Sequence, residues 1–193
     1  MNDSQIGPLI ERIGNLLRSE QRVAGADLGL QAVHLQILSY LSLCNRYSNT
    51  PAGVTEYIGA TKGTISQSIN VLEGKGFIEK VPDSQDGRIT HLELSKIGRS
   101  FIHNNSPLKE FSNTFKEFDD KDSARLSEIL TELLTMLQRK NNGRLFGVCH
   151  TCKYFNRNGL GKSHQCGLTL EPLSDKESLQ ICREHEKPIL EAV

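Results

Sequence analysis

Four of the five cysteines in this chain of 193 residues lie in its last quarter, with the spacing Cys149-x2-Cys152-x13-Cys166-x15-Cys182. The first pair can present two thiolates to one ion, as a tetrahedral metal site requires. The segment that contains the four cysteines has too few large apolar side chains for a core of its own, and a bound metal can supply the missing stability. We therefore predict that the four cysteines hold one metal site.

Zinc suits a structural site of four thiolates, and an iron–sulfur cluster is held by four thiolates equally well. The spacing matches neither common ferredoxin-type run, so zinc is the predicted cofactor and an iron–sulfur cluster is the alternative. Zinc would make the tail a structural or partner-binding module, whereas a cluster would make the protein a redox, oxygen or iron sensor. Unbound thiols, or a dithiol redox pair at Cys149 and Cys152 without a surrounding βαβ pattern, are the other readings.

The residues around the last cysteine predict a local structure for it. Cys182 falls in a stretch that predicts a helix over residues 175–187, with Ser174 as its N-cap. Two histidines, His164 and His185, are close to cysteines in the sequence. With four cysteines available as ligands, we expect both histidines to stay outside the ligand set.

A second group of polar side chains occupies one face of a predicted helix over residues 62–75. Ile65, Ile69 and Leu72 follow the spacing i, i+4, i+7 and should face the core. The opposite face carries amides and hydroxyls, and Gln or Asn can pair with adenine in the major groove. Side chains on the first turn suit contacts with phosphate. The predicted DNA-contacting residues of this helix are Lys62, Thr64, Ser66, Gln67 and Asn70.

The residues after this helix predict a β-hairpin, because residues 77–81 and 89–94 alternate between apolar and polar types around a polar turn. Arg88 at the end of the turn could enter the minor groove, where negative potential is concentrated, and Asp86 could orient it. An ordinary surface ion pair and a merely solvated helix face are the alternatives. With the short helix predicted over residues 54–59, the arrangement favours a winged helix–turn–helix that binds double-stranded DNA.

Longer helices flank this segment, and apolar residues at helical spacing predict them over residues 5–20, 31–44, 95–118 and 121–140. Pro107 should break or kink the third. The last carries a leucine-rich stripe that would be a liability on a monomer, so we expect a dimer interface there, with intrachain core as the alternative. Cys44 ends the second helix and should be a buried, unreactive thiol. Asn141–Gly143 are the expected domain boundary.

Several motifs resemble those of the MarR (multiple antibiotic resistance regulator) family, over about residues 5–140 and not over the cysteine-rich tail. The resemblance implies a homodimeric transcriptional regulator, usually a repressor, that binds an inverted repeat. It also implies dimerisation through the first helix and the last two long helices, and a small-molecule effector pocket. Ser95 stands where the family usually has Thr. The motifs are Thr61-Lys62-Gly63-Thr64-Ile65-Ser66, Leu72-Glu73-Gly74-Lys75-Gly76-Phe77-Ile78, Asp83–Arg88 and Leu94-Ser95-Lys96-Ile97-Gly98.

Composition limits the other classes of protein. Lys and Arg together number 23, as do Asp and Glu, so DNA binding would depend on a few placed cations and helix N-termini. No stretch approaches the roughly 20 apolar residues of a membrane-spanning helix, and the first residues lack the features of a secretory signal. No nucleophile–base set, phosphate loop or nucleotide fingerprint is present. We therefore expect a cytoplasmic protein that is not an enzyme and has no membrane partner.

Together these patterns predict a mainly α fold with a small β-hairpin wing. Residues 1–142 would form a MarR-like DNA-binding and dimerisation domain, and residues 143–193 a cysteine-rich, metal-binding module. Metal binding could regulate DNA affinity by fixing the tail against the dimer helices. The rival hypotheses are an iron–sulfur sensor regulator, an adaptor whose zinc module binds protein partners, and a dithiol redox protein.

Overall fold

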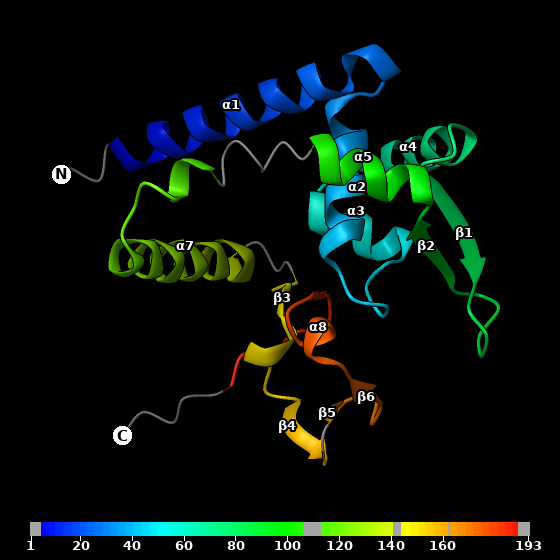
Figure 1. Cartoon of the computed structure of the whole chain (residues 1–193), viewed down its shortest axis with the longest axis vertical. Coiled ribbons are helices and arrows are strands. Elements are labelled where there is room, and N and C mark those ends of the chain that lie inside the picture. The colour runs from blue at the N-terminus through cyan, green and yellow to red at the C-terminus, as the bar shows by residue number, and fades with distance from the viewer. Residues whose placement is uncertain (1–4, 106–112, 141–143, 162, 189–193) are drawn as a thin grey trace.

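The computed structural model describes residues 5–105, 113–140, 144–161 and 163–188. Figure 1 shows a winged-helix lobe, two long helices that extend away from it, and a small β-rich module built by the end of the chain. The predicted break at Pro107 and the predicted boundary at Asn141–Gly143 lie outside the described residues.

Most helices of the lobe begin and end where local signals require. Thr50 and Thr61 are N-caps, since their Oγ1 atoms accept hydrogen bonds from the N–H groups of Gly53 at 3.1 Å and Thr64 at 3.2 Å. Gly59 ends the shorter of these helices with a φ of 72°, a conformation that glycine adopts without strain. The helices are α1 (Ile6–Gly25), a 3-10 turn (Ala26–Leu28), α2 (Ala32–Leu43), α3 (Pro51–Ile58), α4 (Lys62–Gly74) and α5 (Lys96–Asn105).

The wing is a two-stranded antiparallel sheet of β1 (Ile78–Pro82) and β2 (Thr90–Leu94). Its register pairs Ile78 with Leu94 and Pro82 with Thr90. One face of the sheet packs on the helices, and together they bury a largely aliphatic core. Its fully buried side chains include Leu35, Ile37, Leu38, Val54, Ile65, Leu72, Ile78 and Leu92. The fold class is as predicted, mainly α with a small β wing.

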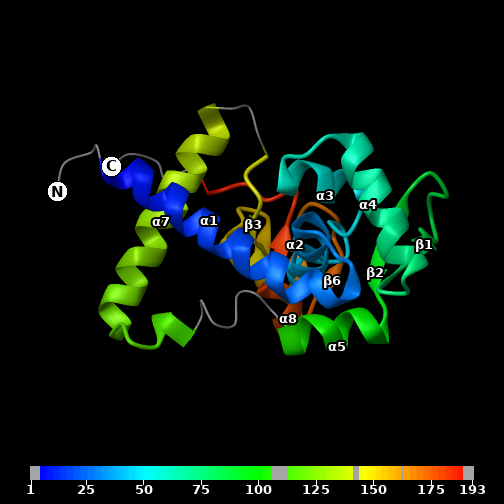
Figure 2. The same cartoon turned by 90° about the horizontal axis from the view of Figure 1, so that it is seen from above.

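The long helices expose their apolar stripes. On α7 (Asp120–Lys140), Ile129 and Leu134 are each 53% exposed, and Leu16 on α1 is 56% exposed. Figures 1 and 2 both show α7 apart from α2, α4 and α5. The alternative that the leucine stripe is intrachain core is therefore wrong for this chain, since most of these side chains contact no interior of their own.

The C-terminal module, residues 144–188, consists of short strands and turns. The predicted helix over residues 175–187 is wrong, because α8 covers only Asp175–Ser178 and Cys182 lies in a strand paired with Gly147. Ser174 and Glu177 form the capping box that begins this turn, but tertiary pairing of Ile181 with the lobe overrides helix propensity beyond it. The elements are β3 (Gly147–Val148), a 3-10 turn (Cys149–Thr151), β4 (Phe155–Leu160), β5 (Ser163–Cys166), β6 (Pro172–Leu173), α8 and β7 (Ile181–Cys182).

Candidate nucleic-acid interface and cysteine site

The outer face of α4 is open. Ile65, Ile69 and Leu72 are at most 2% exposed and hold the helix against the core. On the other side lie exposed polar residues, and these are the ones predicted from the sequence: Lys62, Thr64, Ser66, Gln67 and Asn70. The structure therefore brings the five side chains to one solvent-facing surface, which has the donors and acceptors needed to read base edges.

Lys80 on β1 joins this surface, and the sequence analysis missed it. Its Nζ lies 2.9 Å from Oδ1 of Asn70 and 2.6 Å from Oε2 of Glu73. A hollow of about 310 Å³ separates the N-terminal part of α3 from α4 and is lined by Lys62, Ser66, Asn70 and Lys80, among others. Strand alternation places Lys80 on the same face as buried Ile78 and opposite buried Leu92, so the pattern gave no signal of an outward side chain. Its pairing with Asn70 depends on how the wing packs against α4.

The wing tip presents Arg88 to solvent. Its side chain is 95% exposed, and its Nε lies 4.0 Å from Oδ1 of Asp86. The same Asp86 oxygen accepts a hydrogen bond from the backbone N–H of Arg88 at 3.0 Å, so Asp86 shapes the turn more than it holds the guanidinium. An ion pair so long and exposed contributes little, and the Arg88 side chain is available to a partner.

Asp83 organises the base of this turn, a role that sequence reasoning did not assign. Its Oδ1 accepts hydrogen bonds from the N–H groups of Gln85 and Asp86, both at 2.8 Å, and its Oδ2 lies 2.9 Å from Nε2 of His91. The hydrogen bond with His91, followed by these backbone donors, lowers the pKa of Asp83 to about 2. His91 in turn lies 2.6 Å, through Nδ1, from Oδ1 of Asn49.

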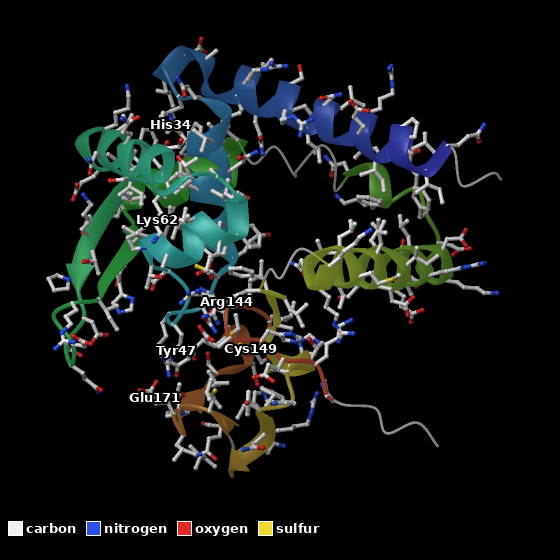
Figure 3. All side chains as sticks on the ribbon, turned by 180° about the vertical axis from the view of Figure 1, so that it is seen from behind. His34, Tyr47, Lys62, Arg144, Cys149 and Glu171 are labelled. Atoms are coloured by element: carbon white, nitrogen blue, oxygen red, sulfur yellow. The ribbon has the colours of Figure 1, made fainter. Side chains whose placement is uncertain are left out.

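The four cysteines of the module line one cavity of about 20 Å³, roughly the space that one water molecule needs. Cys149 and Cys152 come from the 3-10 turn and the residue after it, Cys166 from β5 and Cys182 from β7. Asn45, from the loop between α2 and α3, closes the cavity from the lobe side. Figure 3 shows Cys149 and Tyr47 on the side where the module meets the lobe.

Several N–H groups point at the sulfur atoms. Nδ2 of Asn45 donates to Sγ of Cys149 at 3.3 Å, and the backbone N–H of Glu186 donates to Sγ of Cys152 at 3.5 Å. The pKa of Cys182 is lowered to about 6, chiefly by a hydrogen bond from Cys149 and further by donors that include the backbone N–H of Glu184. The pKa of Cys149 is raised by the same sulfur–sulfur hydrogen bond and by burial. Such donors favour negative charge on sulfur.

The cavity is lined by the residue types of a metal site, but the side chains are not close enough together to share one ion. Within the parts of the chain that the structure describes, no group of three or more His, Cys, Asp or Glu side chains is placed to hold a metal ion. His164 and His185 do not line the cavity. Nε2 of His164 lies 3.0 Å from Oδ1 of Asp175, and Nε2 of His185 lies 2.9 Å from Oγ1 of Thr151. Metal binding by the four cysteines would therefore require their sulfur atoms to draw together.

Cys44 is buried, and burial raises the pKa of its thiol to about 12. A thiol in that state is mostly protonated at neutral pH and is a poor nucleophile. The prediction that Cys44 is a small hydrophobic residue of the core is confirmed.

The module is bound to the lobe at the loop between α2 and α3 and at α3 itself. Asn45 N–H donates to the carbonyl of Ile181 at 2.9 Å. The Arg183 guanidinium makes two hydrogen bonds with Glu56 on α3, at 2.6 and 2.7 Å, and Nε of Arg144 lies 3.1 Å from the same carboxylate. Among the described residues, no hydrogen bond or ion pair joins the module to α1 or α7. The module also faces α7, because Thr131, Leu134 and Thr135 line a hollow together with Phe146, Thr151 and His185. The described polar contacts of the module are thus with the winged-helix lobe, and the expected docking against the dimer helices stays a prediction.

Comparisons with known proteins identify the architecture. Residues 28–89, which include α4, most of the wing and Arg88, match the model of the MarR family. None of the curated proteins compared with the chain is significantly similar to it. In the part of the structure that is described, no helix combines the length and apolarity needed to cross a membrane.

Solved structures of regulators share the fold. A MarR transcriptional regulator from Methanosarcina mazei is 19% identical with a TM-score of 0.58, covering 72% of this chain and 99% of that one. The S. aureus MepR–DNA complex is 19% identical with a TM-score of 0.56, covering 68% and 97%. CouR from Rhodococcus jostii, bound to p-coumaroyl-CoA, is 18% identical with a TM-score of 0.55, covering 66% and 90%. Over about two thirds of its length, this chain therefore has the winged-helix fold of these structures.

Proposed function

We propose that this chain is a sequence-specific DNA-binding transcriptional regulator rather than an enzyme. The observation that carries the proposal is the open face of α4 with its amides and hydroxyls, next to a wing whose Arg88 is 95% exposed. In this arrangement α4 enters the major groove and Arg88 the adjacent minor groove. The match of residues 28–89 to the MarR family supports it, because that family consists of transcriptional regulators.

The regulator acts as a homodimer, in our proposal, on an inverted repeat. Support comes from the many large apolar side chains that α1 and α7 leave in solvent, since contiguous apolar patches mark interaction surfaces. A two-fold axis would present two α4 helices and two wings to one duplex, which compensates for a net charge of zero. Repression is the expected outcome, and a small-molecule effector is an expected partner. The exposed residues include Ile6, Leu9, Ile10, Ile13, Leu16, Ile129, Leu130, Leu134 and Leu137.

DNA binding can be tested with a duplex selected by the protein from a random pool. Arg88→Ala should weaken binding to that duplex about 10-fold with an unchanged melting temperature, because Arg88 packs on nothing. Gln67→Ala should reduce discrimination between the selected and a random duplex by about 10-fold at fixed salt. Arg99→Ala on α5 is the matched control. Fluorescence anisotropy that finds no preference for any duplex would leave the adaptor hypothesis in its place.

We also infer that the four cysteines hold one zinc ion per chain. The support is their convergence on one cavity whose sulfur atoms receive N–H donors from Asn45 and Glu186. Bound zinc would supply a fixed cross-link between the strands of a module with little core. Anaerobically purified protein should be colourless and contain one zinc, and Cys149→Ser should lose the metal while Cys44→Ser keeps it. A brown protein with iron would make the chain an iron–sulfur sensor, and a metal-free protein would favour a dithiol function.

A further inference from the structure

We propose that the loop of residues 45–49 couples the cysteine cavity to the wing, so that zinc in the cavity strengthens DNA binding through Arg88. The inference rests on the proposed function, because it requires both a DNA-reading wing and an occupied cavity. It assigns a positioning role to His91, which contacts neither the metal site nor, in our proposal, the DNA. It adds a route from the tail to DNA through the lobe to the expected route through the dimer helices.

At its first end the loop is part of the cavity wall. Asn45 is 1% exposed, and its side chain donates to Sγ of Cys149 while its Oδ1 accepts from Oγ of Ser48 at 2.6 Å. Ser48 is fully buried and accepts through the same Oγ a hydrogen bond from the N–H of Arg183 at 2.8 Å. Asn45 and Ser48 thus bond to each other, and through Cys149 and Arg183 to the module. A buried hydrogen-bond network of this kind has few alternative arrangements, so a displacement of the Cys149 sulfur displaces the loop as well.

At its other end the loop is part of the wing. The carbonyl of Asn49 accepts a hydrogen bond from the N–H of Leu92 in β2 at 2.6 Å, and its Oδ1 lies 2.6 Å from Nδ1 of His91. His91 passes the connection to Asp83, which holds the turn next to Arg88 through backbone N–H groups. Five consecutive loop residues thus link a cysteine sulfur to the tip of the wing.

The direction of the effect follows from the charge on sulfur. A metal-bound cysteine is a thiolate, and a hydrogen bond to an ionised acceptor is roughly twice as strong as a neutral one. Zinc should therefore tighten the bond from Asn45 to Cys149 and restrict the loop. A restricted loop holds His91 and Asp83 in the arrangement that places Arg88, so the wing loses less freedom when it binds DNA. We expect zinc-loaded protein to bind the selected duplex about 10-fold more tightly than stripped protein.

The test compares full-length protein loaded with one equivalent of zinc against the same protein stripped with a chelator and dialysed. Anisotropy titrations with the selected duplex give the ratio of the two Kd values for the wild type, His91→Ala and His103→Ala. His103 is the matched control, since it lies on α5 and the only hydrogen bond of its side chain among the described residues is with Asn104. The wild type and His103→Ala should show the 10-fold ratio, and His91→Ala a ratio within about twofold of one.

Three other outcomes of this experiment would contradict the proposed coupling between the cavity and the wing. A His91→Ala ratio that stays at 10-fold would overturn the route, because a merely structural role of His91 weakens loaded and stripped protein equally. Failure of the wild type to bind one zinc, or a wild-type ratio of one, also overturns the inference while leaving specific DNA binding intact. If no duplex is selected, hydrogen exchange still decides: zinc must slow the amides of Gln85 and Asp86, which donate to Asp83, in the wild type and leave those of His91→Ala unchanged.

Discussion

The winged-helix lobe and the C-terminal module differ in what they bury. In the lobe the side chains with least exposure are mainly aliphatic, such as Leu35, Ile37 and Leu72. In the module the buried side chains are Phe146, Leu173 and Cys149, together with His164, Ser178 and His185. Burial of the aliphatic side chains is enough to stabilise the lobe. The buried side chains of the module provide little hydrophobic stabilisation, so the module needs other interactions to stay folded.

Two kinds of interaction add stability to the module. The lobe offers the module polar attachment points, among them Asn45 for the Cys149 sulfur and Glu56 for Arg183. The cysteine cavity offers a place where, in our proposal, zinc would join strands that are only two to six residues long. A module that depends on both is suited to regulation, because its stability varies with its ligand while that of the aliphatic core of the lobe does not.

The largest effect should come from the core of the lobe. Leu72→Ala removes a fully buried side chain of α4 and should lower the free energy of unfolding by about 3 kcal/mol. Val71→Ala, at a neighbouring position 39% exposed, should cost less than about 1 kcal/mol. Urea denaturation measures both. Equal costs at the two positions would remove the contrast between core and surface on which the description of the lobe depends.

Removal of zinc should act on the module and the wing turn and spare the helical core of the lobe. When free zinc exceeds its Kd by 100-fold, a ligand-bound state gains about 2.7 kcal/mol, which is about 100-fold in the opening equilibrium. Chelation should therefore speed amide exchange within residues 144–188 by up to about 100-fold and leave the amides of α2 unchanged. Exchange that accelerates equally in α2 would show that the two regions unfold as one unit.

A smaller effect should come from the contact between the regions. Arg183→Ala removes two hydrogen bonds to Glu56, an interaction that also lowers the pKa of the Glu56 carboxyl. Because Glu56 is 36% exposed, the pair should contribute only about 1 kcal/mol. A double-mutant cycle with Glu56→Ala isolates that contribution in urea denaturation. A coupling free energy of zero would mean that the module is held by its other contacts with the lobe, such as the loop of residues 45–49 and the edge-on packing of Phe146 against Tyr57.

The smallest effect should come from an ion pair within the module. Lys153 and Glu186 lie 2.5 Å apart at the surface, and solvent screens such a pair. Lys153→Ala should leave the melting temperature and the zinc content unchanged. A loss of zinc in this variant would instead show that the residues next to Cys152 contribute to the cavity through more than their backbone.

The elements of the winged helix were predictable because their signals are local. Thr61 as N-cap, the i, i+4, i+7 spacing of Ile65, Ile69 and Leu72, and the polar turn before Arg88 each act within a few residues. The exposed stripe of α7 was predictable for the same reason, since a helix with that pattern has one apolar face wherever it lies. Because these interactions join residues that are close in the sequence, they can be predicted from the sequence alone.

The route between the regions could be decided only by tertiary structure. Asn45 precedes Cys149 by 104 positions, and no spacing rule connects them. The helix predicted around Cys182 failed because strand pairing with Gly147 outweighed a favourable capping box. Side-chain types and helix faces follow from neighbours along the chain, but the meeting of Asn45 with sulfur and of Asn49 with His91 follows from the packing of distant segments, whose free energy no local pattern encodes.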